Sequence, residues 1–159
     1  MLFVMFFAFG SLLVHVEPTL QLLRWEWCGP TSAGEFQAVF KKLVAYSKCH
    51  QVTNWLADVS RMAPVGTDEQ AWLSEAWLAE FATVGIQSIA LILPLGLHNQ
   101  LVVENVLTDG RRYARAEVQF FSDIPAALDW LAPTVAQAQA LEQQWEEAKL
   151  LPAAESLSL

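Results

Sequence analysis

The stretch Ile89-Ala90-Leu91-Ile92-Leu93 is an unbroken apolar run near the middle of the chain. A strand that is apolar on both faces is typical of a parallel sheet with helices on both sides, because neither face of the strand then meets water. We therefore expect a buried strand over residues 86–93, with a helical segment before it and another after it.

The segments that flank this run both have helical patterns. Upstream, Pro64 and Gly66 mark a loop, and residues 67–70 (Thr-Asp-Glu-Gln) have the form of a capping box that begins a helix. That helix is predicted to end at about residue 83, and its apolar stripe consists of Leu73, Trp77, Leu78 and Phe81. Downstream, residues 97–107 predict a shorter helix that ends in a turn at residues 108–110.

An alternating pattern closer to the N-terminus predicts an antiparallel hairpin. In residues 20–28, Leu23, Trp25 and Trp27 fall on one side of the predicted strand, and Arg24 and Glu26 fall on the other. Alternation with a period of two is typical of a half-buried strand. Residues 11–16 predict the partner strand of the hairpin.

The remaining segments continue the alternation of strand and helix. Thr31 or Ser32 is predicted to begin an amphipathic helix, and Ser32 with Glu35 three positions later has the form of a second capping box. Strands are predicted over residues 52–60 and 115–121, and a helix over 124–131 with Asp123 or Ser122 as its N-cap. From Pro133 onward, a narrow apolar stripe on a polar segment predicts a helix that packs peripherally or not at all; it consists of Ala138, Leu141, Trp145 and Ala148.

The predicted order of elements is ββαβαβαβα, followed by the extra C-terminal helix. This order is typical of an α/β fold with a mixed, mostly parallel sheet, here of five strands, joined by right-handed crossovers. We expect one domain over residues 11–132, an apolar leader or strand extension over 1–10, and a peripheral helix with a loose tail over 133–159.

Composition excludes several classes of protein. The chain has 159 residues, of which 54 % are hydrophobic, so it is long enough and apolar enough to bury a core. Its net charge of −8, with no basic patch, argues against binding to nucleic acid. Residues 1–14 are apolar except for Ser11 but shorter than the roughly 20 residues that span a bilayer, and no Lys or Arg precedes Arg24. We therefore expect no membrane span and a cytoplasmic protein, with a signal or membrane anchor as the alternative.

Six stretches of the chain carry a resemblance to a known family. They are Leu22–Trp27 with Gly29, Glu35-Phe36, Trp55–Met62, Asp68–Leu73, Ile89–Pro94, and Phe120–Asp123 with Ala126, Ala127, Trp130 and Leu131. In these stretches the sequence resembles the SpoIIAA-like family, whose members have the STAS fold and are described as STAS/SEC14-type. The resemblance covers about three quarters of the chain and implies a SpoIIAA-like/STAS fold.

The best understood relatives in that family are anti-sigma-factor antagonists, and the resemblance implies a similar regulatory role. Those proteins change partners when a serine is phosphorylated in an Asp-Ser-Ser-Gly-like turn after the third strand, where a helix N-terminus favours negative charge. Here Asp58 follows the predicted strand without that tetrad, and Ser60 and Thr67 are the nearest hydroxyl groups. Both are candidate phosphorylation sites, and Thr67 is alternatively a simple N-cap.

The carboxyl ends of the predicted parallel strands bring together residues of several chemical types. Ligands of open α/β sheets bind at this edge, which here would gather Asp58, Ser60, His98, Ser122 and Asp123. The chain has no Gly-x-Ser-x-Gly motif and no glycine-rich phosphate loop, and each of these residues is also a common cap or turn former. The three histidines lie in separate elements without the spacing of metal ligands. We therefore expect a non-enzymatic protein with no metal and no cofactor.

Trp72 lies away from the apolar stripe of its predicted helix and needs a covering group. The C-terminal helix, a second copy of the chain or an apolar ligand would each supply one. Two functions follow. The first is a regulatory or protein-interaction module that binds an unidentified protein, or forms a homodimer, through a surface at Asp58, Ser60, Thr67 and Trp72.

The second function is a binder or carrier of a lipid or other apolar small molecule, which the SEC14-type label and the aromatic-rich composition favour. A cavity larger than a few waters, lined by Trp55, Trp77 or Phe81, would favour this binder. A closed core with a flat exposed patch around Trp72 would favour the interaction module.

Overall fold

Six strands form one sheet in the order in which they occur along the chain, in a computed structural model that describes residues 5–29, 32–113 and 115–150. The first three strands pair antiparallel, and the third to the sixth pair parallel. The α/β class and the mixed, mostly parallel sheet are thereby confirmed. The strands are β1 (Met5–Phe9), β2 (Leu12–Glu17), β3 (Leu22–Trp27), β4 (Asn54–Asp58), β5 (Ser88–Ile92) and β6 (Glu117–Phe121).

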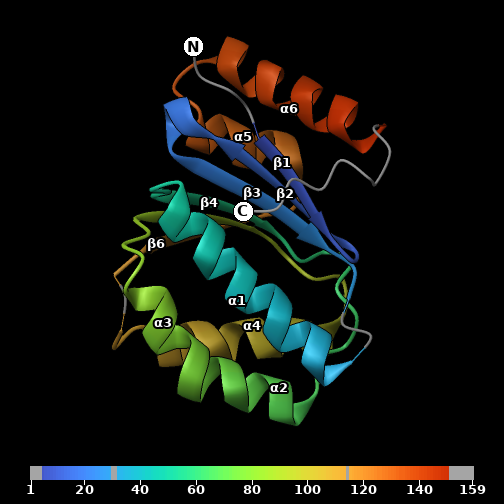
Figure 1. The fold of residues 1–159 in the computed structure, drawn as a ribbon, viewed down its shortest axis with the longest axis vertical. Coiled ribbons are helices and arrows are strands. Elements are labelled where there is room, and N and C mark those ends of the chain that lie inside the picture. Colours follow the sequence, from blue (N-terminus) through green and yellow to red (C-terminus); the bar gives the residue numbers. More distant parts are fainter. Residues whose placement is uncertain (1–4, 30–31, 114, 151–159) are drawn as a thin grey trace.

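Helices cover both faces of this sheet (Figure 1). Since right-handed crossovers between parallel strands taken in sequential order all fall on one face, the helices that join β3 to β6 share a single layer. That layer contains α1 (Ala33–Cys49), α2 (Thr67–Trp72), the π-helical turn η2 (Leu73–Trp77), α3 (Leu78–Ala82) and α4 (Leu97–Gly110). The other face carries α5 (Ile124–Leu131) and α6 (Val135–Lys149), and a short 3-10 turn η1 (Pro18–Leu20) joins β2 to β3.

Strand β1 corrects the predicted number of strands from five to six. It pairs antiparallel with β2 across a tight turn in which Gly10 has a φ of 57°. Phe7 stacks on Tyr46 of α1 on one face of the sheet, and Phe6 stacks on His15 on the other. The segment is apolar at every position although only Phe7 is fully buried, and this uniform composition hides the alternation that otherwise marks a strand. Residues 1–4 lie outside the described part of the chain.

The predicted half-buried strand over residues 20–28 is instead buried on both faces in β3. Arg24 and Glu26 do point away from Trp25 and Trp27, as the alternation indicates, but they lie beneath α6 rather than in water. The C-terminal helix is therefore not peripheral: Trp145 is 0 % exposed and its ring lies beneath the Arg24 guanidinium, with the Cζ atom 4.0 Å from the ring centre. The predicted tail at residues 151–159 lies outside the described residues.

The predicted helix over residues 67–83 is one helical segment with a π-helical interruption. Leu78 N–H donates to the carbonyl of Leu73, five residues earlier, which widens the helix at η2. Thr67 is not the N-cap. Gly66 takes that position without a side-chain hydrogen bond, so the predicted capping box does not form. The two other predicted caps are confirmed, because Ser32 Oγ accepts from Glu35 N–H and Asp123 Oδ1 accepts from Ala126 N–H.

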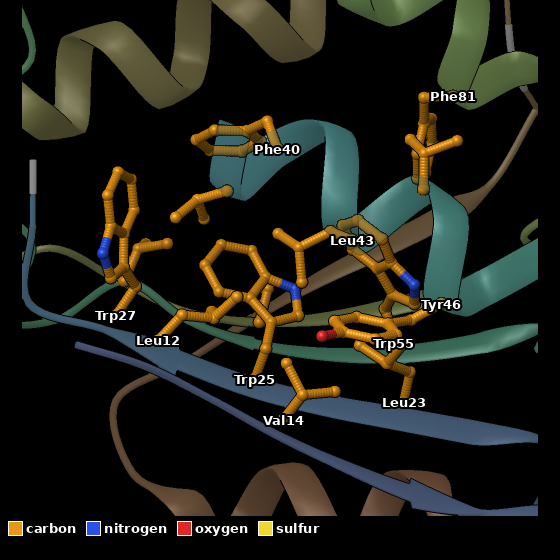
Figure 2. Close-up of a cluster of buried hydrophobic side chains, with 14 of the residues drawn as sticks. Leu12, Val14, Leu23, Trp25, Trp27, Phe40, Leu43, Tyr46, Trp55 and Phe81 are labelled. Atoms are coloured by element: carbon orange, nitrogen blue, oxygen red, sulfur yellow. The ribbon is translucent and has the colours of Figure 1, made fainter. Parts of the chain in front are cut away.

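The core between the sheet and α1 is built largely from aromatic rings. Trp25 and Trp27 rise from β3 toward Phe40 and Leu43 of α1 (Figure 2). Edge-to-face pairs join Trp25 to Phe40 and to Trp55, with ring centres 6.0 and 5.9 Å apart. A second, smaller core lies between the sheet and α5 and α6 and contains mainly aliphatic side chains. The aromatic core is the one that positions the candidate site.

Candidate functional site

An apolar cavity of about 120 Å³ lies inside the aromatic core. Strands β3 to β5 form its floor, and α1, the η2–α3 segment and α4 form its roof. The cavity wall includes Trp25, Phe40, Trp55, Trp77 and Phe81, and the surface that faces the cavity is entirely apolar. Cavities of this size and character stay dry and accept small apolar molecules such as benzene.

Of the three tryptophans in the wall, Trp55 and Trp77 have hydrogen-bond partners for their indole nitrogen atoms, whereas Trp25 Nε1 is buried without a partner among the described residues. Trp77 Nε1 donates to the Phe40 carbonyl at 2.9 Å. Trp55 Nε1 donates to Ser47 Oγ at 3.0 Å, and that hydroxyl donates in turn to the Leu43 carbonyl. Two of the bulkiest side chains around the cavity are thereby fixed in orientation, and their rings rather than their nitrogen atoms face the space.

The π-helical turn supplies a large part of the roof. Leu73 and Trp77, at its two ends, are both buried and both line the cavity. The hydrogen bond from Leu78 to Leu73 places these two side chains one above the other, where a regular helix would turn them about 140° apart. Single π-helical turns inside helices are frequent at functional sites.

Asn99 holds the loop that closes one side of the cavity. Its Oδ1 accepts from Val65 N–H at 2.9 Å, and its Nδ2 donates to the carbonyls of Met62 and Ala63 at 3.0 Å. Sequence reasoning missed this residue. The available signal was its position, since Asn99 with Val102, Val103 and Val106 forms the inward stripe of α4, and a lone amide on such a stripe needs buried partners.

A groove of about 640 Å³ lies beside the cavity, between α4 and the edge strand β6. Leu93 and Phe120 line it and remain partly open to solvent, with Phe120 49 % exposed. The groove and the cavity share one wall, made of Leu78, Phe81, Ile89, Val103, Val106 and Leu107. The cavity therefore adjoins a groove that is open to solvent and has mainly apolar sides.

The residues of the predicted interaction surface belong to different layers. Asp58 shares the sheet face of Leu56, beneath α5 and α6, and its Oδ1 accepts from the N–H and the hydroxyl of Ser60. Thr67 is exposed at the start of α2, in the opposite layer. Trp72 is half-buried in that layer and meets Phe36 of α1 edge to face at 6.2 Å. The structure thus joins Asp58 to Ser60 but separates both from Trp72, whose cover within the described chain is α1 rather than the C-terminal helix.

The remaining residues of the strand edge have separate partners. His98 Nε2 lies 2.6 Å from the Val65 carbonyl, and Asp123 caps α5. In the described part of the chain no hydrogen bond joins His98 to Ser60 or to Ser122, and no group of three His, Cys, Asp or Glu side chains is arranged to hold a metal ion. Among these same residues, no helix is both long and apolar enough to cross a bilayer.

Charged side chains form a buried cluster beneath α6. Arg24 is 3 % exposed, and its Nη2 lies 3.7 Å from Glu142 Oε1. Burial lowers the pKa of Arg24 to about 10, although Glu142 and Asp58 act to raise it. Glu26 forms ion pairs with Arg61 and with Lys149, the latter at 3.3 Å. These pairs join β3 to α6 and to the loop after β4, so the cluster fastens elements of the fold together.

His15 lies in the same layer and stays neutral. Its ring is stacked on Phe6 at 4.5 Å, and neither ring nitrogen has a hydrogen-bond partner among the described residues. Burial, with a smaller contribution from the neighbouring Arg24 charge, lowers the pKa of His15 to about 3. A histidine with so low a pKa is uncharged at neutral pH.

Comparison of the chain with protein-family models, with curated proteins and with solved structures returned no significant match.

Proposed function

We propose that the protein is a non-enzymatic binder of an apolar small molecule, which occupies the cavity in the aromatic core. The single observation that carries the proposal is the cavity itself, about 120 Å³ in volume and lined by Trp55, Trp77 and Phe81. The size exceeds that of a few waters, while an entirely apolar wall offers water no hydrogen bond.

The stability of the chain gives a second argument. Side chains that line an apolar space lack partner atoms on the side that faces it, so they make fewer dispersion contacts than the rest of the core. A ligand that restores the missing contacts stabilises the protein, because binding to the folded state alone stabilises that state.

The test uses benzene as the probe and a variant that fills the space. Titration with benzene should quench or shift the fluorescence of the tryptophans in the wall and should raise the Tm. Ala57 of β4 lines the cavity, so Ala57→Leu should occupy it and abolish both responses. Leu141→Ala, in the second core, is the matched control, because it should lower the Tm while leaving the benzene response in place. A wild-type protein that shows no response to benzene would contradict the proposal.

A second candidate function is the regulatory, STAS-type interaction module, and exposed leucines favour it. Leu95 and Leu97, in and after the loop that follows β5, are 83 % and 70 % exposed. Neighbouring apolar side chains of this size on a surface are typical of contact with another protein. If two copies of the chain meet there, sedimentation velocity should show a dimer that Leu95→Ser with Leu97→Ser converts to a monomer. A wild-type monomer at all concentrations would exclude the homodimer.

A further inference from the structure

We infer that the ligand is a single-chain amphiphile with an anionic head, whose tail enters the cavity from the α4–β6 groove and whose head binds at Arg111. The inference rests on the proposed function and adds the chemical class of the ligand and its path of entry. It follows from the shape of the two spaces and from the charges at the end of the groove.

The shape of the two spaces suits a chain better than a compact molecule. The cavity alone, at about 120 Å³, holds only a few carbon atoms, whereas the groove beside it adds about 640 Å³. The wall that they share is aliphatic and aromatic throughout, so a hydrocarbon chain meets apolar side chains in both spaces. The shared wall includes Val103 and Val106 of α4, which makes this helix the element that a chain passes on its way inward.

The outer part of the groove is polar. Gln100, Glu104 and Thr108 lie along α4, and Arg111 follows the last residue of that helix; all four line the groove. The apolar part of the groove is therefore suited to hydrocarbon, and the polar row along α4, which ends at Arg111, is suited to a polar head. This division is the one expected of a site for an amphiphile, where a few polar groups fix the orientation of an otherwise apolar ligand.

Arg111 lines the groove and begins a run of arginines in an otherwise acidic protein. Arg111, Arg112 and Arg115 supply three of the nine basic residues within five positions, whereas the chain carries a net charge of −8. Within the described residues, no carboxylate forms an ion pair with any of the three. A cation after a helix C-terminus also offsets the helix dipole, which accounts for Arg111 but not for the two arginines that follow it.

Glu104 is the opposing charge, and it makes the inference testable in two directions. It lines the same groove as Arg111, without an ion pair to it among the described side chains. If an anionic head binds at this end, loss of the arginine charge weakens binding and loss of the glutamate charge strengthens it. A change in folding alone would not give opposite signs for the two variants.

The experiment compares four probes that share a twelve-carbon chain: dodecanoate, dodecyl phosphate, dodecanol and dodecyltrimethylammonium. Dissociation constants are measured below micelle concentrations by calorimetry and by tryptophan fluorescence. We expect at least one of the two anions to bind about 10-fold more tightly than dodecanol, and the cation to bind most weakly. Arg111→Gln should weaken anion binding about 3- to 5-fold, as expected for one partly exposed charge pair, and leave dodecanol unchanged.

Two further variants and the choice of anion complete the design. Glu104→Gln should tighten anion binding, and Lys41→Gln on the exposed side of α1, with the same change in net charge as Arg111→Gln, should have no effect. Tighter binding of dodecanoate would indicate a free fatty acid, and tighter binding of dodecyl phosphate a phosphorylated lipid. Both outcomes support an anionic head.

Two results would overturn the inference and leave the proposed function in place. One is equal affinity for dodecanol and for the anions. The other is a benzene response in the cavity with no binding of any twelve-carbon probe. A protein that binds neither benzene nor the chains would overturn the proposed function as well.

Discussion

At the scale of single residues, the most unusual feature is a polar pair buried under α6. His15 and Arg24 are directly opposite each other in the β2–β3 ladder, and each has side-chain nitrogen atoms without partners in the described chain. Leaving a buried polar atom unpaired is destabilising by about 1–3 kcal/mol, so neither residue is explained by hydrogen bonding. Each side chain instead packs against an aromatic ring: His15 stacks on Phe6, and the Arg24 guanidinium lies over Trp145.

His15 makes the stability of the protein depend on pH. Its pKa is about 3 in the folded protein and about 6.5 in the unfolded chain, so between these values only the unfolded chain binds the proton. The free energy of unfolding should therefore fall as the pH is lowered from about 6.5, by up to about 1.4 kcal/mol per pH unit. Urea denaturation at pH 7, 6 and 5 measures this.

The control for this prediction is His15→Phe, which keeps an aromatic ring beside Phe6 and removes the titrating group. The difference between the two proteins isolates the histidine from the carboxyl groups that titrate in the same range. As the pH falls, the free energy of unfolding of the variant should increasingly exceed that of the wild-type protein. A constant difference from pH 7 to pH 5 would show that His15 is accessible to protons in the folded state.

At the scale of elements, helix α6 differs most from its prediction, because it packs on the sheet rather than at the periphery. Its polar composition indicates a peripheral helix, but its narrow stripe faces the only charged side chains that β3 presents. Ala138 and Leu141 pack into the aliphatic core, while Trp145 covers Arg24. The helix is polar on its inner side because it pairs with buried charges, and patterns of hydrophobicity alone do not reveal such a contact.

Loss of the Trp145 ring should therefore have a large effect on stability. Trp145→Ala removes a fully buried ring and exposes Arg24, so we expect the free energy of unfolding to fall by about 3–5 kcal/mol. Gln143→Ala, on the exposed side of the same helix, should change it by less than about 0.5 kcal/mol. Denaturation with urea compares the two. Similar small losses for both variants would mean that α6 contributes little to the fold.

At the scale of the whole molecule, the sequence predicted the order of strands and helices better than it predicted the packing between them. The apolar run at residues 89–93 and the alternation in β3 were enough to predict an α/β protein with an antiparallel start, because these patterns reflect which faces are covered. The sixth strand was missed because β1 is apolar at every position and shows no alternation. The π-helical turn was missed because Leu73–Trp77 carries no breaker, and packing rather than propensity sets its geometry.

The sequence predicted which residues line the candidate site but not that a cavity exists there. Trp55, Trp77 and Phe81 were identified as core residues and as the side chains that a cavity would use, and they do line one. The existence of the space was not predictable, because a cavity is what remains when large rings meet at fixed angles, and sequence patterns contain no such angles. The predicted surface residues failed to meet for a similar reason: Asp58 and Trp72 are close to the same strand edge in the topology but lie in opposite layers.

The sequential order of the strands also has a consequence for how the chain folds. Each of the six strands pairs with its neighbour along the chain, so no closure within the sheet spans more than one helical crossover. Helix α6 is the exception, since it returns from the β6 side to β2 and β3, near the other end of the chain. We expect this long closure to form last and to open first, with amide hydrogens of α6 exchanging faster than those of β3 to β5. The chain would thus pass through a state in which the aromatic core and its cavity are complete while Arg24 still faces water.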